Sequence, residues 1–231
     1  MLSLRLTNLV IIILSQFLGA YYLLEINLED TSQSFRLLFL MACSVLSAIS
    51  GNLINDFFDW EIDLINKKRK WKGEQLTLRK VAVGVSVCSM IFAVFLSVKV
   101  FILVGLNQAL LYLYSRNFKG LPFLGNVVIA FLSSTVILIL GFEFGLKPSL
   151  ISFAAFAFIS TLLRELIKDV EDIEGDTALN LRTIPIVLGP KMTKMVLFIL
   201  GALLFILPWL FFLATQEKSY LISYRSQSRE Q

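Results

Sequence analysis

Residues 37–63 read LLFLMACSVLSAISGNLINDFFDWEID, an apolar run that passes without a break into a cluster of carboxylates. Residues 37–58 are long enough to cross a bilayer, since a membrane helix needs about 20 mostly apolar residues. Carboxylates next to an apolar segment are costly. The stretch therefore predicts a membrane helix whose end carries a chemical site.

The composition extends this interpretation to the whole chain. Its 231 residues are 57% hydrophobic and 16% charged, with a mean hydropathy of +0.77, whereas soluble domains are about 45–50% apolar and about 25% charged. We therefore expect an all-α, polytopic membrane bundle. Seven stretches are predicted to span the membrane: Leu9–Leu24, Leu37–Phe58, Val81–Val98, Val100–Tyr114, Phe123–Gly141, Leu150–Ile167 and Met195–Ala214.

Two of these spans need comment. The first could be taken for a signal peptide, but it lacks a clear small-residue cleavage site and six more spans follow, so we interpret it as a helix. Only Lys99 separates the third span from the fourth, which predicts a tight hairpin.

The side chains that are absent exclude several kinds of site. Histidine does not occur, which excludes a Ser-His-Asp triad, a His-ligated zinc or haem and a His general base. Cys43 and Cys88 each lie inside an apolar run, so a disulfide scaffold and a Cys zinc site are excluded as well. A metal would need oxygen ligands from Asp, Glu or Asn, which points to magnesium or calcium.

The basic residues concentrate in alternate loops. By the positive-inside rule, the N-terminus and the three basic loops face the cytoplasm, and seven spans then place the C-terminus outside. An alternative is that these residues only set the topology. The loops carry Lys67, Lys68, Arg69, Lys70, Lys72, Arg79 and Lys80, then Arg116 and Lys119, then Lys168, Arg182, Lys191 and Lys194.

Two acidic clusters repeat one spacing at the cytoplasmic ends of spans two and six. Both follow D-x-x-D-x-x-x-D, and at about 100° per residue each trio lines one face if the helix continues that far. Like-charged faces repel unless cations lie between them, and carboxylates suit magnesium, which leaves positions for substrate phosphates. The alternative is solvated helix-end carboxylates. The trios are Asp56, Asp59 and Asp63, and Asp169, Asp172 and Asp176.

These motifs resemble those of the UbiA-type intramembrane prenyltransferase superfamily. Residues 52–63 resemble its first signature, N-x-x-x-D-x-x-D with a further Asp, and residues 169–176 resemble its second, D-x-x-D-x-x-G-D. Residues 114–126 resemble the short basic segment between spans four and five. Residues 164–189 look most like the branch that builds ether lipids by transferring a geranylgeranyl group to geranylgeranylglyceryl phosphate.

The resemblance implies an Mg²⁺-dependent transfer of an isoprenoid chain from an allylic diphosphate to a lipophilic acceptor, in membrane lipid and without nucleic acid. Asp56, Asp59, Asp172, Asp176 and Lys119 would be catalytic. The metal ligands would be Asn52, Asp56, Asp59, Asp63, Asp169, Asp172 and Asp176. The diphosphate would be bound by Asn52, Arg116, Lys119, Arg69 and Lys168.

The resemblance also implies nine helices, whereas this sequence supplies seven spans. We expect one transmembrane domain over residues 1–214 and a tail over 215–231 that reads as the opening of an eighth span, as in a truncated family member. Three alternatives stay open: transfer to an aromatic acceptor as in quinone biosynthesis, a non-catalytic relative that binds prenyl diphosphate, and a transporter.

Overall fold

The computed structural model describes residues 5–60, 73–178 and 181–227, and the described residues form helices without strands. The side chains of Ala178, Leu210 and residues 212–227 are outside this description. In chain order the elements are α1 (Leu6–Leu18), η1 (Gly19–Leu23), α2 (Thr31–Phe58), α4 (Gln75–Val94), α5 (Val98–Leu113), η2 (Tyr114–Phe118), α6 (Leu124–Phe144), α7 (Pro148–Glu171), α8 (Ile173–Ala178) and α9 (Ile184–Gln227).

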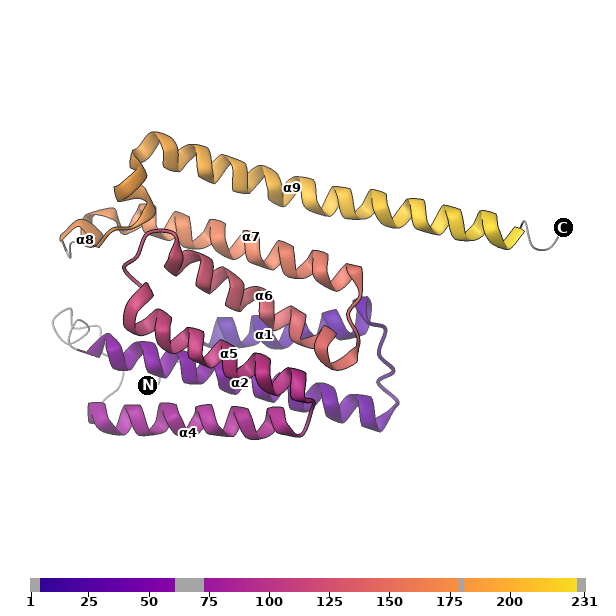
Figure 1. The fold of residues 1–231 in the computed structure, drawn as a ribbon, viewed down its shortest axis with the longest axis horizontal. Coiled ribbons are helices and arrows are strands. Elements are labelled where there is room, and N and C mark those ends of the chain that lie inside the picture. The colour runs from indigo at the N-terminus through magenta and orange to yellow at the C-terminus, as the bar shows by residue number, and fades with distance from the viewer. Residues whose placement is uncertain (1–4, 61–72, 179–180, 228–231) are drawn as a thin grey trace.

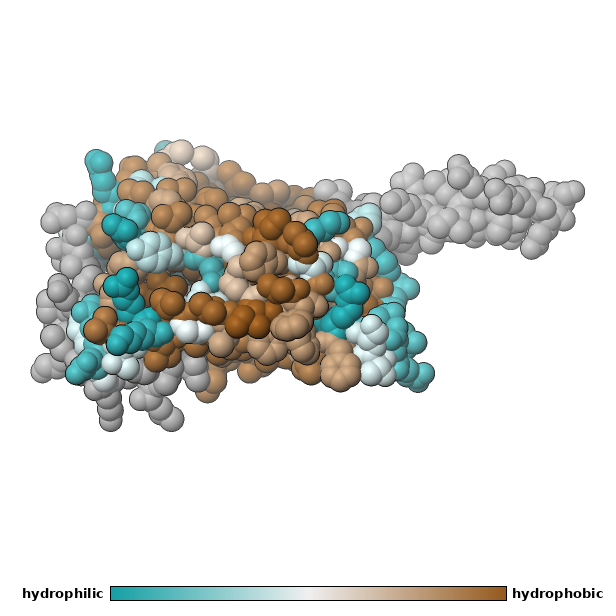
Figure 2. Space-filling view, turned by 60° about the horizontal axis from the view of Figure 1, so that its bottom comes forward, coloured by the Kyte–Doolittle hydropathy of each residue, from teal (hydrophilic) through white to brown (hydrophobic). Residues whose placement is uncertain are grey.

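The long helices run side by side along one axis (Figure 1). Among the described residues, seven helical segments are long and apolar enough to cross a membrane, which agrees with the predicted spans. Apolar side chains form a broad band on the face seen in Figure 2, and hydrophilic residues gather at its two ends. Large apolar side chains such as Phe198 and Phe205 are 78% and 84% exposed, as expected for surfaces that face lipid.

The α2–α4 pair shows how the helices hold together. Cys43 donates to the Ser89 carbonyl oxygen at 3.4 Å, and the Ser89 hydroxyl donates to the Cys43 carbonyl oxygen at 2.9 Å. Nearer the acidic end, the Ser50 hydroxyl donates to the Ala82 carbonyl oxygen at 3.1 Å. Small residues allow close approach between membrane helices, and such hydrogen bonds add attraction that lipid does not replace.

The hairpin between spans three and four turns earlier than predicted. Helix α4 ends at Val94, and α5 begins at Val98 with Ser97 as its N-cap, whose hydroxyl accepts from the Val100 amide. Lys99 therefore lies in the first turn of α5 and not in the turn. The Ser97 cap decides the helix start, a local hydrogen bond that hydropathy does not register.

Helix α9 is kinked near its start and is much longer than predicted. Gly189 has φ 72° and ψ 170°, a conformation that favours glycine, and Pro190 follows it. Residues 215–227, predicted as a tail, continue this helix. In Figure 1, α9 extends well past the ends of the other helices.

A short connection between α5 and α6 folds back tightly at one end of the bundle. The π-helical turn η2 places the Lys119 amide 3.0 Å from the Tyr114 carbonyl oxygen, and the chain enters α6 through Phe123 at φ 63°. Gly125, in the first turn of α6, lies against the Phe118 carbonyl oxygen, which a Cβ atom would approach to 2.9 Å. Glycine at position 125 therefore allows η2 and α6 to pack together.

We expect Gly125→Ala to destabilise the protein by about 1–3 kcal/mol, because the new methyl group meets backbone and not a movable side chain. The matched control is Gly84→Ala in α4, where a Cβ meets nothing within 4 Å. Thermal unfolding in detergent should show a lower Tm for Gly125→Ala and an unchanged or slightly higher one for the control. Equal Tm values for the two variants would contradict this account of the η2–α6 connection.

Candidate functional site

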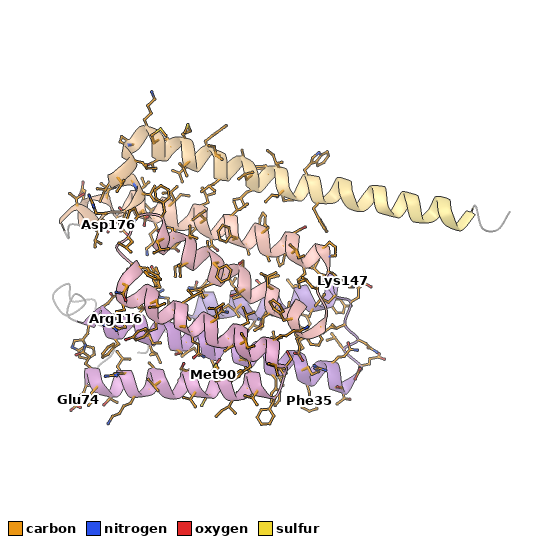
Figure 3. The ribbon with its side chains drawn as sticks, in the orientation of Figure 1. Phe35, Glu74, Met90, Arg116, Lys147 and Asp176 are labelled. Carbon is orange, nitrogen blue, oxygen red and sulfur yellow. The ribbon has the colours of Figure 1, made fainter. Side chains whose placement is uncertain are left out.

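The predicted chemical groups gather at one end of the bundle. Figure 3 shows Glu74, Arg116 and Asp176 at this end and Phe35 and Lys147 at the opposite end. A cavity of about 710 Å³ opens here between the ends of α2 and α7, next to η2 and the start of α1. It is lined by Arg5, Asn8, Ile12, Ala48, Gly51, Asn52, Asn55, Asp59, Leu111, Tyr114, Ser115, Lys119, Ile129, Arg164, Glu165, Ile167, Lys168 and Glu171, and we call it the mouth.

The first acidic cluster is held at the end of α2. Asp59 is the C-cap of this helix, and its amide donates to the Asn55 carbonyl oxygen at 2.9 Å. Its carboxylate Oδ2 accepts from the Asn55 side-chain amide at 2.8 Å and pairs with the Lys119 ammonium at 2.5 Å. The Asp59 carboxylate is thus stabilised by the Asn55 side chain of its own helix and by the Lys119 cation from the η2–α6 connection.

The second acidic cluster repeats this geometry at the end of α7. Asp172 is the C-cap, with φ −93° and ψ 5° against −82° and 2° for Asp59, and its amide donates to the Lys168 carbonyl oxygen at 2.9 Å. The Asp169 carboxylate accepts from the Asn126 side-chain amide on α6 at 2.7 Å. Asp176 lies on the separate short helix α8.

One shared face for each trio requires a helix that continues through it, and this condition is not met for the second trio, because α7 ends at Glu171. Helix α2 likewise ends at Phe58, before the middle aspartate of the first trio. Asp59 and Asp172 both have backbone angles outside the helical range, and Asp176 follows on the separate helix α8. A spacing of three and four residues fits one face only while the helix continues. Asp63 lies outside the described residues, as does Arg69.

Only some of the predicted residues reach the mouth. Asn52, Asp59, Lys119 and Lys168 line it. The other described candidates do not line it: Asp56 near the end of α2, Asp169 and Asp172 at the end of α7, Asp176 on α8, and Arg116 in η2. Arg116 turns toward Tyr112, donating to its hydroxyl at 3.2 Å and lying 6.0 Å from its ring centre. Within the described residues, Arg116 is thus directed to an aromatic ring beside the cavity.

Sequence reasoning missed several residues of the mouth, namely Arg5, Asn55, Tyr114, Arg164, Glu165 and Glu171. One signal was available: Arg164 and Glu165 are adjacent charges inside an apolar span, which marks a functional position in a membrane helix. In the described structure the mouth has four cationic side chains, Arg5, Lys119, Arg164 and Lys168, and three carboxylates, Asp59, Glu165 and Glu171. This excess of positive charge favours an anionic ligand.

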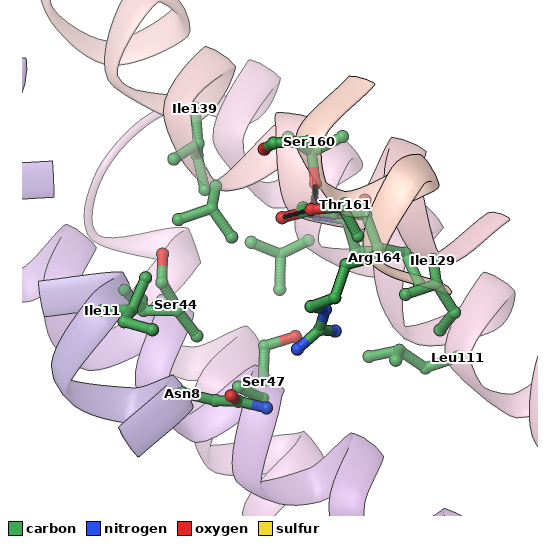
Figure 4. Close-up of a pocket in the computed structure, with 18 residues that line it drawn as sticks. Asn8, Ile11, Ser44, Ser47, Leu111, Ile129, Ile139, Ser160, Thr161 and Arg164 are labelled. Carbon is green, nitrogen blue, oxygen red and sulfur yellow. Dashed lines mark hydrogen bonds between the residues drawn. The ribbon is translucent and has the colours of Figure 1, made fainter. Parts of the chain in front are cut away.

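A second cavity, of about 420 Å³, adjoins the mouth inside the bundle, and we call it the chamber (Figure 4). One part of its wall is aliphatic, formed by residues such as Ile11, Val104 and Ile139. The mouth and the chamber share six lining residues, which define a throat between them: Asn8, Ile12, Ala48, Leu111, Ile129 and Arg164. An elongated ligand can therefore place a charged end in the mouth and an apolar body in the chamber.

The oxygen donors at the acidic ends fit a magnesium ion whose coordination shell is completed by other ligands. Within residues 5–60, 73–178 and 181–227, no three carboxylate or thiol side chains lie close enough together to hold a metal ion. Magnesium usually takes one or two protein carboxylates and completes its shell with water and substrate phosphate. The donor set therefore fits a magnesium ion that is bound together with a phosphate ligand.

The relatives of this chain include digeranylgeranylglyceryl phosphate synthases. The chain is 37% identical over 149 residues to a digeranylgeranylglyceryl phosphate synthase of Methanopyrus kandleri, an alignment that covers 60% of this chain and 53% of that protein. The chain spans a little over half the length of the curated relatives that it matches, 53%, 54% and 61% for three of them.

The fold of this chain is also similar to that of solved structures. One from a study of digeranylgeranylglyceryl phosphate synthase in membranes superposes with a TM-score of 0.74 at 27% identity, covering 91% of this chain and 76% of that one. A UbiA homologue from Archaeoglobus fulgidus, bound to DMAPP and Mg²⁺, shares the fold with a TM-score of 0.67 at 19% identity, covering 88% of this chain and 74% of that one.

The model of the UbiA prenyltransferase family matches residues 12–224, which include α2, α7 and both acidic helix ends. By this match over most of its length, the chain belongs to the UbiA prenyltransferase family.

Proposed function

We propose that this integral membrane protein transfers a geranylgeranyl group from geranylgeranyl diphosphate to geranylgeranylglyceryl phosphate, with Mg²⁺ as cofactor. The observation that carries the proposal is the pair of adjoining cavities, a charged mouth and a chamber with an aliphatic wall, which share six lining residues. Similarity to proteins named digeranylgeranylglyceryl phosphate synthase supports this acceptor.

The proposed reaction exchanges one C–O bond for another. The bond between the allylic carbon and the diphosphate oxygen breaks, and diphosphate leaves with the electron pair. The acceptor hydroxyl oxygen then bonds to the allylic carbon, and its proton leaves to solvent or to the departing diphosphate. The charge that develops is that of diphosphate, so stabilising this anion is the main catalytic task.

The side chains at the two helix ends divide this task. Asn52, Asp56, Asp59 and Asp63 on one side, and Asp169, Asp172 and Asp176 on the other, would hold magnesium. Bound magnesium supplies Lewis-acid neutralisation of the diphosphate. Lys119 and Lys168 line the mouth and add positive charge for the phosphate oxygens. Lys119 also balances Asp59 before a ligand binds.

The chamber would hold the prenyl chain against its aliphatic wall. Ile11, Val104 and Ile139 belong to this wall and offer neither a nucleophile nor a proton. Excluding water matters here because the allylic carbon becomes cationic as the bond breaks, and water would capture it.

Replacing Asp56 or Asp172 with Asn should reduce turnover about 10²-fold or more, the loss typical when one electrostatic contact to a transition state is removed. The assay measures transfer from labelled geranylgeranyl diphosphate per folded molecule. Asp30→Asn is the matched control, because Asp30 caps the N-terminus of α2 and Asn caps equally well. Wild-type turnover in Asp56→Asn, or a loss in Asp30→Asn as large as in the site variants, would contradict the proposed role.

Binding of inorganic pyrophosphate should depend on magnesium. Calorimetry in detergent should show binding that weakens at least about tenfold in excess chelator, because the lysines alone supply only single point charges. Adding back magnesium should restore the affinity. Affinity that is unchanged by the chelator would remove magnesium from the proposal.

The acidic end should face the cytoplasm, because the basic loops lie there. Cysteines placed at Glu74 or Arg182, at the acidic end, should be protected from a membrane-impermeant maleimide in intact cells. A cysteine at Glu29, at the other end, should react. These cysteines are introduced into a protein that carries Cys43→Ser and Cys88→Ser, so that the native cysteines, of which Cys88 is exposed, do not react with the maleimide. Labelling at Glu74 but not at Glu29 would reverse the proposed orientation.

A further inference from the structure

The chamber has a single charged side chain among the described residues that line it, and that side chain is Arg164. Arg164 lies on α7 at the throat, because it lines the mouth as well. Figure 4 shows its guanidinium reaching into the space beside Asn8 and Ser47. A charged side chain inside a membrane helix bundle is costly unless it pairs with another group or binds a ligand.

The protein satisfies only part of this guanidinium. Its Nη2 pairs with Glu165 Oε1 at 2.6 Å, and no other hydrogen bond to Arg164 forms within the part of the chain that the structure describes. The Arg164 side chain is 63% exposed while the Glu165 side chain is 12% exposed. A guanidinium has five N–H donors in a fork that fits carboxylate or phosphate. Glu165 thus positions Arg164 and leaves most of its donors facing open space.

The chamber wall around Arg164 is more polar than a hydrocarbon chain requires. Thr161 donates to Ser133 at 2.9 Å, and Asn107 donates to Thr135 at 2.9 Å. The Asn107 Oδ1 atom is buried without a partner among the described residues. A ligand made only of hydrocarbon would leave the Asn107 Oδ1 atom unpaired at a cost. The chamber therefore suits a ligand that has an anionic head, hydroxyl or ether oxygens and an apolar body.

We propose that Arg164, the only charged side chain among the described residues of the chamber, binds the phosphate group of the prenyl acceptor at the throat, where it belongs to the wall that both cavities share. This inference rests on the proposed function and assigns the second substrate of the same site. The donor diphosphate would be bound by the acidic helix ends and by the lysines of the mouth. In the described lining of the chamber, Arg164 is the one charged side chain that could bind the phosphate monoester of the acceptor. Two carbon atoms separate the phosphate oxygen from the hydroxyl of the acceptor, so anchoring the phosphate keeps the nucleophile close to the throat.

The test combines three variants with two acceptors. Arg164→Gln removes the charge, Arg164→Lys keeps the charge but loses the fork, and Arg79→Gln is the control. Arg79 lies in α4 near the acidic end and lines neither cavity. The acceptors are geranylgeranylglyceryl phosphate and the neutral geranylgeranylglycerol. Steady-state kinetics give KM for each acceptor and for the donor, and thermal unfolding in detergent measures acceptor binding without turnover.

We expect Arg164→Gln to raise KM for the phosphate acceptor about 10–100-fold, the scale for loss of a charged hydrogen bond. KM for the donor and for the neutral acceptor should stay within about twofold of wild type, and Arg164→Lys should give an intermediate KM for the phosphate acceptor. Arg79→Gln should match wild type. The phosphate acceptor should raise the Tm of wild type and not that of Arg164→Gln.

Three results would overturn the inference: equal losses with both acceptors, a raised KM for the donor, or the same Tm shift in wild type and Arg164→Gln. If Arg164→Gln does not fold, Arg164→Lys decides by the same comparison of acceptors. If wild type transfers only to another acceptor, the proposed function fails. The Tm shifts then still decide whether Arg164 binds the phosphate, and no shift in wild type means that both proposals fail.

Discussion

The candidate site at this end of the bundle depends on how the negative charges of the carboxylates at two helix C-termini are stabilised. The negative end of each helix dipole already disfavours these carboxylates. Residues 118–126 supply the compensation for both. Lys119 pairs with Asp59 at the end of α2, and Asn126 donates to Asp169 near the end of α7. One short segment therefore ties the two acidic ends together, and it can fold this tightly because Gly125 lies against the Phe118 carbonyl oxygen.

The cavities follow from this arrangement. The ends of α2 and α7, which both contact residues 118–126, border the mouth, and the chamber below it is lined by α1, α2, α5, α6 and α7. The number of charged side chains falls from the mouth to the chamber. The mouth has several cations and carboxylates, whereas the described lining of the chamber has only Arg164. This gradient suits two substrates that each join a phosphate group to a long hydrocarbon chain.

The spans and the pairing of acidic clusters could be predicted from sequence, because hydropathy and the repeated Asp spacing are local signals. The C-caps at Asp59 and Asp172 could not, because the repeated Asp spacing is compatible with a helix that continues through the cluster and carries no signal for where the helix ends. Hydropathy also misplaced the turn at Ser97, which is set by a single cap hydrogen bond. The charges of Arg164 and Glu165 inside an apolar span were an available signal that was overlooked, but only the packing of α7 shows that Arg164 lines both cavities.

The central claim is that the two acidic helix ends act as one binding site. A double-mutant cycle tests it directly, with pyrophosphate affinity measured in the presence of magnesium for Asp56→Asn, Asp169→Asn and the double variant. One shared site predicts that the double variant loses little more than either single variant, a coupling free energy of about 1 kcal/mol or more. Losses that add within about 0.5 kcal/mol would show that the two ends act independently and would contradict the account.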